Sequence, residues 1–189
     1  MEIETKGILG LRVQDVARKA NVSVPLIYKY FGDRDGLLVE VLSEMFEDCR
    51  VRHNGPAMEI IAAHTGPVTV DLLMKLMVMP DNDQAAKDRA MTAQMLAAAA
   101  EIPALRARLA GTSGELHSST TMFLTQSFKM LGMGDSVPTS ALAMLFQSVN
   151  FGLLFNDLLD GNGASHDELV GLLRVMLESV VERHSISHS

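Results

Sequence analysis

Residues 12–34 read RVQDVARKANVSVPLIYKYFGDR, and this stretch decides how the N-terminal part of the chain folds. Its first half carries small apolar side chains at helical spacing, which form a single apolar stripe: Val13, Val16, Ala17 and Ala20. The residues that follow break this spacing before it resumes. We therefore expect a short helix, a tight turn and a second short helix.

The turn and the second helix have recognisable ends. Asn21 tolerates the left-handed backbone conformation in which helices often stop. Ser23 is a good N-cap, and Pro25 fits a first helical turn because the N–H groups there have no partners within the helix. Ile27 is expected to face inward together with Phe31, and Gly32 ends the helix. This pattern predicts a helix-turn-helix, whose second helix enters the major groove of DNA.

The same stretch resembles the DNA-binding end of TetR-type transcriptional repressors. The matching residues are Val13, Asp15, Val16, Ala17, Ala20, Val22, Ser23, Ile27, Tyr28, Tyr30, Phe31, Gly32, Asp33, Arg34, Asp35 and Leu37. Over the rest of the chain the resemblance is confined to length and helical layout. It implies an all-α fold, with a DNA-binding head over residues 1–36 and a helical-bundle domain for ligand binding and dimerisation over residues 37–189.

The N-terminus departs from that family. There, a first helix of about four turns supports the two DNA-reading helices. Lys6, Gly7 and Ile8 align with the end of that helix and the loop after it, so we expect most of the helix to be absent. An alternative function follows from this expectation: a dimeric small-molecule-binding or interaction protein whose shortened head no longer binds DNA.

Charge and composition set further limits. The chain of 189 residues has a net charge of −7, yet residues 11–34 hold five basic side chains against two acidic ones. A basic head on an acidic body favours one orientation toward phosphates. Cys49 is the single cysteine, which excludes an internal disulfide and fits a cytoplasmic protein. The sequence shows no signal peptide and no uninterrupted membrane-spanning stretch, so we expect no membrane partner.

The candidate DNA contacts fall into two groups. Long polar side chains are expected to reach phosphates: Arg12, Tyr28, Lys29 and Arg34. Of these, Tyr28 and Arg34 match family positions that usually touch phosphate. The exposed start of the second helix is expected to read bases through Val24, Pro25 and Leu26, with Tyr30 as a further candidate. Mostly apolar side chains can contact thymine methyl groups, so we expect modest specificity from this helix alone.

The remaining sequence predicts further helices. Asp33 is the expected N-cap of a helix that runs to about His53 and stops at residues 54–56, where the sequence is Asn-Gly-Pro. Later helices are expected over residues 57–64, 68–79, 84–100, 103–131 and 139–160, with a last one opening at Ser165 or His166. Gly111 and Gly114 are candidate points for a bend or break in the helix over residues 103–131.

The last two helices predict a homodimer. Residues 139–160 are apolar on two sides, and a helix of this kind must be covered on more than one side. We expect these two helices to pair with their copies in a four-helix interface, which is also where the resembled family dimerises. The alternative is that both helices form the central core of a single chain.

A small apolar ligand is expected inside the body, because methionine adapts to irregular apolar space. The expected lining consists of Met74, Met77, Met91, Met95, Met122 and Phe123, and the alternative is a filled core. No cofactor is expected. The six histidines form no metal-binding spacing such as HExxH, and there is no glycine-rich phosphate loop or nucleophile elbow. These absences argue against an enzyme.

Overall fold

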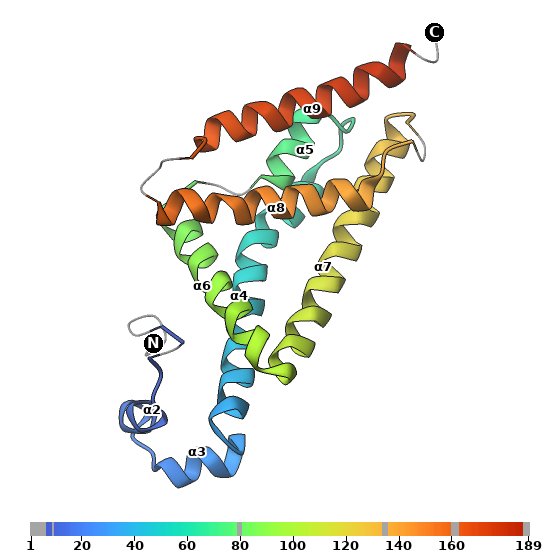
Figure 1. Cartoon of the computed structure of the whole chain (residues 1–189). Helices are drawn as coiled ribbons and strands as arrows, with labels where there is room; N and C mark the ends of the chain where they lie inside the picture. Colours follow the sequence, from blue (N-terminus) through green and yellow to red (C-terminus); the bar gives the residue numbers. More distant parts are fainter. Residues whose placement is uncertain (1–6, 9, 79–80, 134–135, 160–162, 187–189) are drawn as a thin grey trace. The chain divides into compact units, whose positions relative to one another are not determined.

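The computed structural model describes the chain except residues 1–6, 9, 79–80, 134–135, 160–162 and 187–189 (Figure 1). The described residues form eight helices and no strand, which confirms the expected all-α fold. The helices are α2 (Val13–Ala20), α3 (Val24–Phe31), α4 (Arg34–Ala63), α5 (Val70–Met77), α6 (Asp83–Glu101), α7 (Pro103–Met130), α8 (Thr139–Leu158) and α9 (His166–Ile186). The expectation about the first helix concerns residues outside this description.

The predicted helix ends are confirmed by local hydrogen bonds. Asn21 ends α2 in the left-handed conformation, with a φ of 55°. The Ser23 hydroxyl accepts a hydrogen bond from the Leu26 amide at 3.3 Å, and the Asp33 carboxylate accepts one from the Gly36 amide at 2.8 Å. These bonds satisfy amide groups that the first turn of a helix leaves without partners. Helix α2 therefore ends, and helices α3 and α4 begin, where the sequence predicts.

The start of α9 is held by a reciprocal cap. The Ser165 hydroxyl accepts from the Glu168 amide at 3.2 Å, while the Glu168 carboxylate accepts from the Ser165 amide at 2.8 Å. This arrangement is a capping box. The bonds from Ser165 favour the charged carboxylate and lower the pKa of Glu168 below its ordinary value.

The predicted stop at residues 54–56 is wrong. Helix α4 continues through Pro56 to Ala63, although a proline inside a helix cannot donate to the carbonyl group four residues earlier. One turn before Pro56, the Arg52 guanidinium donates to the buried Asp88 carboxylate on α6 at 2.9 Å. This contact helps to hold α4 where its own sequence favours an end. Helix α7 likewise runs through Gly111 and Gly114 without ending.

The chain divides into two compact units. The head unit comprises the described residues of Met1–Val51 and Ala90–Ser113, and the body unit comprises those of Arg52–Arg89 and Gly114–Ser189. Helices α4, α6 and α7 each contribute residues to both units. The predicted head of residues 1–36 thus lies within the head unit, and the predicted domain boundary after residue 36 stays a prediction.

Two apolar clusters form the head unit. The head cluster consists of the buried residues Val13, Ala17, Ile27 and Leu37, which join α2 and α3 to the start of α4. The junction cluster joins the residues before α2 to parts of α4, α6 and α7. Its buried members are Ile8, Leu11, Leu38, Val39, Leu42, Met95, Ala99, Leu105 and Leu109.

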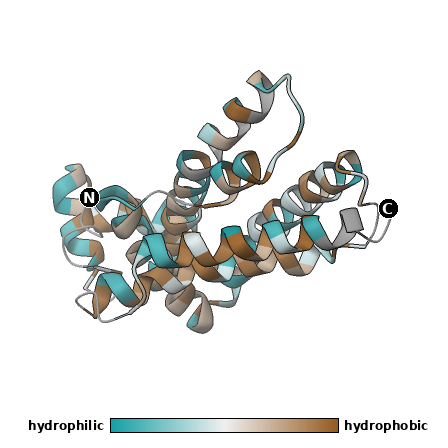
Figure 2. Cartoon of the chain, turned by 90° about the horizontal axis from the view of Figure 1, so that it is seen from above, coloured by the Kyte–Doolittle hydropathy of each residue, from teal (hydrophilic) through white to brown (hydrophobic). Residues whose placement is uncertain are grey.

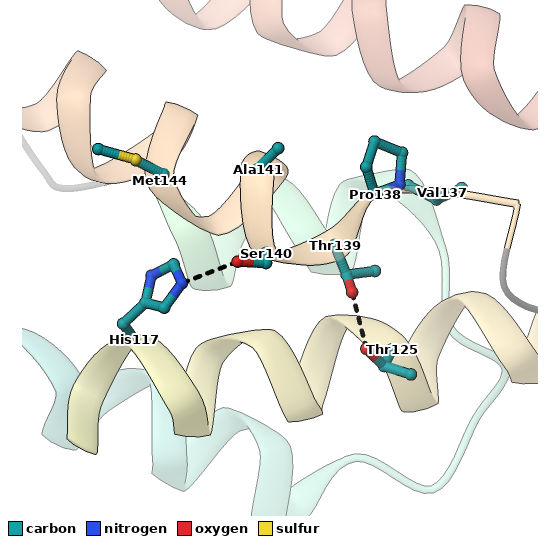
Figure 3. Close-up of a pocket in the computed structure, with 8 residues that line it drawn as sticks. All are labelled: His117, Thr125, Val137, Pro138, Thr139, Ser140, Ala141 and Met144. Atoms are coloured by element: carbon teal, nitrogen blue, oxygen red, sulfur yellow. Dashed lines mark hydrogen bonds between the residues drawn. The ribbon is translucent and has the colours of Figure 1, made fainter. Parts of the chain in front are cut away.

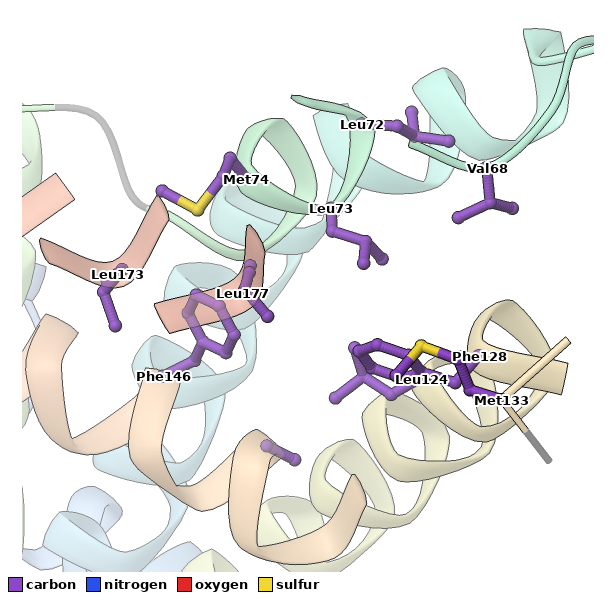
Figure 4. Close-up of a cluster of buried hydrophobic side chains, with 11 residues drawn as sticks. Val68, Leu72, Leu73, Met74, Leu124, Phe128, Met133, Phe146, Leu173 and Leu177 are labelled. Carbon is purple, nitrogen blue, oxygen red and sulfur yellow. The ribbon is translucent and has the colours of Figure 1, made fainter. Parts of the chain in front are cut away.

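The body unit has a core of its own, the body cluster, shown in Figure 4. Phe128 and Leu124 on α7 are completely buried in it, as is Leu73 on α5, and Phe146 on α8 and Leu177 on α9 are nearly so. The other buried members are Val68, Leu72, Met74, Met133, Ala143 and Leu173. Four helices therefore share one apolar core, as in other helical bundles.

The body cluster generates a stability prediction. Phe128→Ala removes a completely buried ring and leaves a cavity, so we expect the free energy of unfolding to fall by about 3–5 kcal/mol. Urea denaturation at a fixed protein concentration measures this change. Met122→Ala on the same helix is the matched control, because Met122 is 71% exposed and its removal should change stability by much less. Equal losses in the two variants would contradict the assigned core.

Candidate DNA-binding interface

Helices α2 and α3 present the candidate DNA-binding surface, and a small apolar contact fixes their mutual position. Val13 and Ala17 of α2 are 4% and 3% exposed, and Ile27 of α3 and Leu37 of α4 are 5% and 4% exposed. Phe31 is half-buried and packs against the same cluster, as the sequence predicts. Each of these two helices has only eight residues, so this packing is what holds them together.

The opposite face of α3 is open to solvent. Tyr30 is 74% exposed, Tyr28 40% and Leu26 38%, and Pro25 and Lys29 are exposed as well. Val24 differs from its neighbours, because it is half-buried and packs against the head cluster. Most of the predicted DNA-contacting residues of α3 are thus exposed together on one helix. Val24 is the exception, because only part of its side chain is exposed.

The two arginines predicted to bind phosphate lie at helix starts. Arg12 is the exposed N-cap residue of α2. Arg34 begins α4 and has partners within the protein: its guanidinium donates to the Ile8 carbonyl at 3.4 Å and lies 3.6 Å from the Asp35 carboxylate. The sequence did not predict these partners. They give Arg34 a part in fixing the residues before α2.

The structure identifies one further residue of the head unit that sequence reasoning missed. Gln94 of α6 accepts a hydrogen bond from the Ile8 amide through its side-chain oxygen, at 3.2 Å. These two residues are 86 positions apart in the chain. Gln94 lies in an alanine-rich stretch with no recognisable motif, so no local signal could have selected it.

The six residues of the predicted ligand site are distributed over the two units. Met95 is completely buried in the junction cluster of the head unit, and Met91 packs against that cluster. Met74 is buried in the body cluster, where Met77 and Phe123 pack against it, whereas Met122 is exposed. The methionines of the described interior are thus mostly core residues of two separate units.

The body unit has a hollow of about 590 Å³ with polar and apolar lining residues, between α7 and the start of α8 (Figure 3). His117 lies 3.0 Å from the Ser140 hydroxyl, and the hydroxyl groups of Thr125 and Thr139 are 2.8 Å apart. Apolar side chains complete the lining: Val137, Pro138, Ala141 and Met144. A small polar molecule could exchange hydrogen bonds with these groups, but none of the six predicted ligand residues lies in this lining.

A second hollow of about 230 Å³ lies between α8 and α9, and every residue that lines it is apolar. Leu142, Leu145 and Phe146 line it from α8, and Met176 and Val180 line it from α9. It holds no hydrogen-bonding side chain that could select a polar ligand. It extends the exposed apolar surface of these two helices.

A buried ion pair connects α6 to α8 in the body unit. Arg89 is 4% exposed and donates two hydrogen bonds to the Asp157 carboxylate, at 2.6 and 2.8 Å. The bond to Asp157 raises the pKa of Arg89 above its ordinary value. Among the described residues, no group of histidine, cysteine and acidic side chains has a metal-binding arrangement.

Comparison with known proteins agrees with this geometry. Residues 1–41 match the family model of bacterial regulatory proteins of the tetR family. The HTH-type transcriptional regulator BetI of Burkholderia thailandensis is 33% identical over 60 residues, which cover 30% of this chain and 31% of that protein. BetI of Paraburkholderia phymatum is 35% identical over 48 residues, covering 25% and 24% of the two chains. The match thus spans a third or less of these curated relatives.

Solved structures extend the similarity over the whole fold. A structure from Rhodococcus sp. described as a TetR-family transcriptional regulator has a TM-score of 0.67 and 25% sequence identity. The similarity covers 95% of this chain and 92% of that one. Salmonella enterica GusR has a TM-score of 0.61, at 16% identity, over 95% and 89% of the two chains, and it supports the fold alone.

The Ser23 cap generates a prediction about α3. Ser23→Ala removes the acceptor for the Leu26 amide, so we expect a loss of about 1 kcal/mol in local stability. The only two tyrosines of the chain, Tyr28 and Tyr30, lie on α3, and there is no tryptophan. Tyrosine fluorescence during urea denaturation therefore reports directly on this helix.

Ser118→Ala on α7 is the control for Ser23→Ala. Ser118 is exposed within a helix, where alanine has the higher helix propensity, so this variant should be neutral or slightly stabilised. An unchanged tyrosine transition in Ser23→Ala would show that the cap does not stabilise α3.

Proposed function

We propose that this chain is a TetR-type transcriptional regulator that binds double-stranded DNA as a homodimer and represses transcription until a small molecule releases it. The match of its first 41 residues to the tetR family model and the similarity of its all-helical fold to a TetR-family structure support this proposal. The observation that carries the DNA-binding proposal is the exposed face of α3. Its side chains project from a helix that the head cluster fixes from behind, as a major-groove reading helix requires.

The DNA contacts divide by chemistry. Lys29 supplies a charge for phosphate, and the hydroxyl group of Tyr28 can donate a hydrogen bond to a phosphate oxygen. Pro25 and Leu26 offer apolar surface to thymine methyl groups at the start of α3, where a recognition helix meets base edges. Arg12 adds a cation at the start of α2. We propose these residues, together with Arg34, Tyr30 and the exposed part of Val24, as the DNA-binding surface.

The dimer proposal rests on the large apolar side chains that α8 and α9 expose; Figure 2 colours the ribbon of the chain by the hydropathy of each residue. Phe155 and Leu158 of α8 are 64% and 65% exposed, and Leu172 and Val175 of α9 are 58% and 57% exposed. Large apolar side chains at this density mark an interaction surface. A second copy would cover them in a self-complementary interface and place two α3 helices against two half-sites of an operator.

Helix α8 is also the one described helix that is long and apolar enough to cross a membrane. Its polar side chains argue for a protein partner instead. Asn150 donates to the Met77 carbonyl at 3.1 Å, and Asp157 binds Arg89. A family of transcription regulators acts where the chromosome lies, so we propose a cytoplasmic location.

We propose that the releasing ligand binds the body unit. The family resemblance supports this site, and Met74, Met77 and Phe123 offer adaptable apolar side chains at the body cluster. The alternative of a dimer that no longer binds DNA depends on residues 1–6, which lie outside the described structure. The family match over residues 1–41 favours the DNA-binding function.

The exposed Lys29 generates a test of DNA binding. Lys29→Ala should weaken binding to all duplexes and lower the slope of log affinity against log salt by about one unit, because one phosphate contact fewer releases one counterion fewer. Fluorescence anisotropy of a labelled duplex selected from a random pool, repeated over a salt series, measures both quantities.

Lys75→Ala is the matched control, because it removes the same charge from an exposed position on α5 of the body unit. Its salt slope should equal that of the wild type. If both variants lost the same slope, net charge rather than a contact of α3 would explain the effect.

The α8–α9 surface generates a test of the dimer. Phe155→Asp places a charge on the proposed interface, where its desolvation is costly, so the variant should be monomeric at micromolar concentration. Analytical ultracentrifugation measures the mass. Met122→Asp introduces the same charge at an exposed methionine on α7 and should leave the dimer intact. A dimeric Phe155→Asp protein would place the interface elsewhere.

A further inference from the structure

The peptide groups of Ile8 connect three elements of the head unit. The Ile8 amide donates to the side-chain oxygen of Gln94 on α6 at 3.2 Å. The Ile8 carbonyl accepts from the Arg34 guanidinium of α4 at 3.4 Å and from the Leu11 amide at 3.3 Å. The last of these bonds closes a turn directly before α2. Both polar groups of one buried residue are therefore used to join this turn to α4 and α6.

The side chain of Ile8 is anchored by the same elements. Ile8 is 4% exposed and Leu11 6% exposed, and both belong to the junction cluster. In that cluster they lie with Leu42 of α4 and Met95 of α6, which are completely buried. Met95 directly follows Gln94, so two adjacent residues of α6 supply the hydrogen bond to the Ile8 amide and an apolar packing partner in the junction cluster.

Close approach directly before this turn also explains the glycine at position 7. Gly7 has a φ of 69°, which side-chain-bearing residues rarely adopt. A Cβ atom at position 7 would lie 3.0 Å from the Gln94 side-chain oxygen. Gly7 thus leaves room for Gln94 to reach the Ile8 amide.

The position of this turn affects the position of α3 through α2. Arg12 follows Leu11 directly and is the N-cap residue of α2. Val13 and Ala17 of α2 then hold Ile27 of α3 in the head cluster. An eight-residue helix has little stability beyond its packing contacts. The position of the start of α2 therefore depends on the contacts of Ile8 with Gln94 and Arg34.

We propose that Gln94 is a positioning residue for DNA binding: through the Ile8 amide it fixes the turn before α2 on α6 and so sets the orientation of α3. The inference rests on the proposed DNA-binding function. Gln94 itself touches no DNA in this mechanism. It raises the fraction of molecules in which α3 is correctly oriented, and the apparent affinity falls in proportion to that fraction.

Gln94→Leu tests the mechanism, because leucine keeps an apolar stem and lacks the acceptor oxygen. We expect a 3- to 10-fold weaker affinity for the selected duplex, of the order of one neutral hydrogen bond, with the wild-type salt slope. An unchanged slope separates a positioning residue from a phosphate contact such as Lys29. Gln94→Glu keeps an acceptor oxygen for the Ile8 amide, and we expect it to recover most of the affinity at high salt, where its added charge is screened.

Gln126→Leu is the matched control, since it makes the same substitution at an exposed glutamine of α7 in the body unit. It should bind DNA as the wild type does. Urea denaturation and sedimentation of all variants establish that the body and the dimer are intact. Wild-type affinity in Gln94→Leu would overturn the inference, and so would a reduced salt slope.

Hydrogen exchange tests the connection without DNA. In Gln94→Leu the Ile8 amide should exchange faster, and so should the amides of α2, while those of α7 beyond Gly114 stay protected. Faster exchange at Ile8 with unchanged exchange in α2 would also overturn the inference. A wild-type protein that binds no duplex would contradict the proposed function, and the exchange experiment would still decide whether Gln94 fixes α2.

Discussion

The candidate DNA-binding head depends on the burial of four apolar side chains. Val13, Ala17, Ile27 and Leu37 are the buried residues that join α2, α3 and the start of α4. Isolated helices shorter than about 12–15 residues are marginal in water, and α2 and α3 have eight residues each. Their stability therefore comes from this packing contact and from the caps at Ser23 and Asp33. The exposed side chains of α3 acquire a fixed direction only because the opposite face is buried.

The head cluster is small, and the structure supports it from the neighbouring junction cluster. The junction cluster includes Leu38 and Leu42, which follow Leu37 along α4, and Ile8 and Leu11, which precede α2 in the chain. Residues far along the chain, on α6 and α7, complete this second cluster and belong to the same compact unit. The candidate DNA-binding head is therefore not an independent module, because its packing includes residues of α6 and α7.

The body unit uses its apolar surface in two different ways. Phe128, Leu124 and Leu73 are completely buried and hold α5, α7, α8 and α9 around one core. Other large apolar residues of α8 and α9 remain exposed, which a single chain does not explain. The predicted apolar character of α8 on two sides thus corresponds to one side that packs in the core and another that is exposed. Two polar contacts also hold α8 in place: Asn150 binds the Met77 carbonyl at the end of α5, and Asp157 binds Arg89 on α6.

The sequence by itself determined the all-α class, the turn at Asn21, the caps at Ser23 and Asp33 and the inward direction of Ile27. These features depend on neighbouring residues, whose spacing and chemistry are readable along the chain. Only the tertiary structure carried α4 through Pro56, divided the predicted methionine site between two cores, and gave Arg34 and Gln94 their shared partner at Ile8. Those features join residues tens of positions apart, and their contact energies outweigh local preference without leaving a pattern in the sequence.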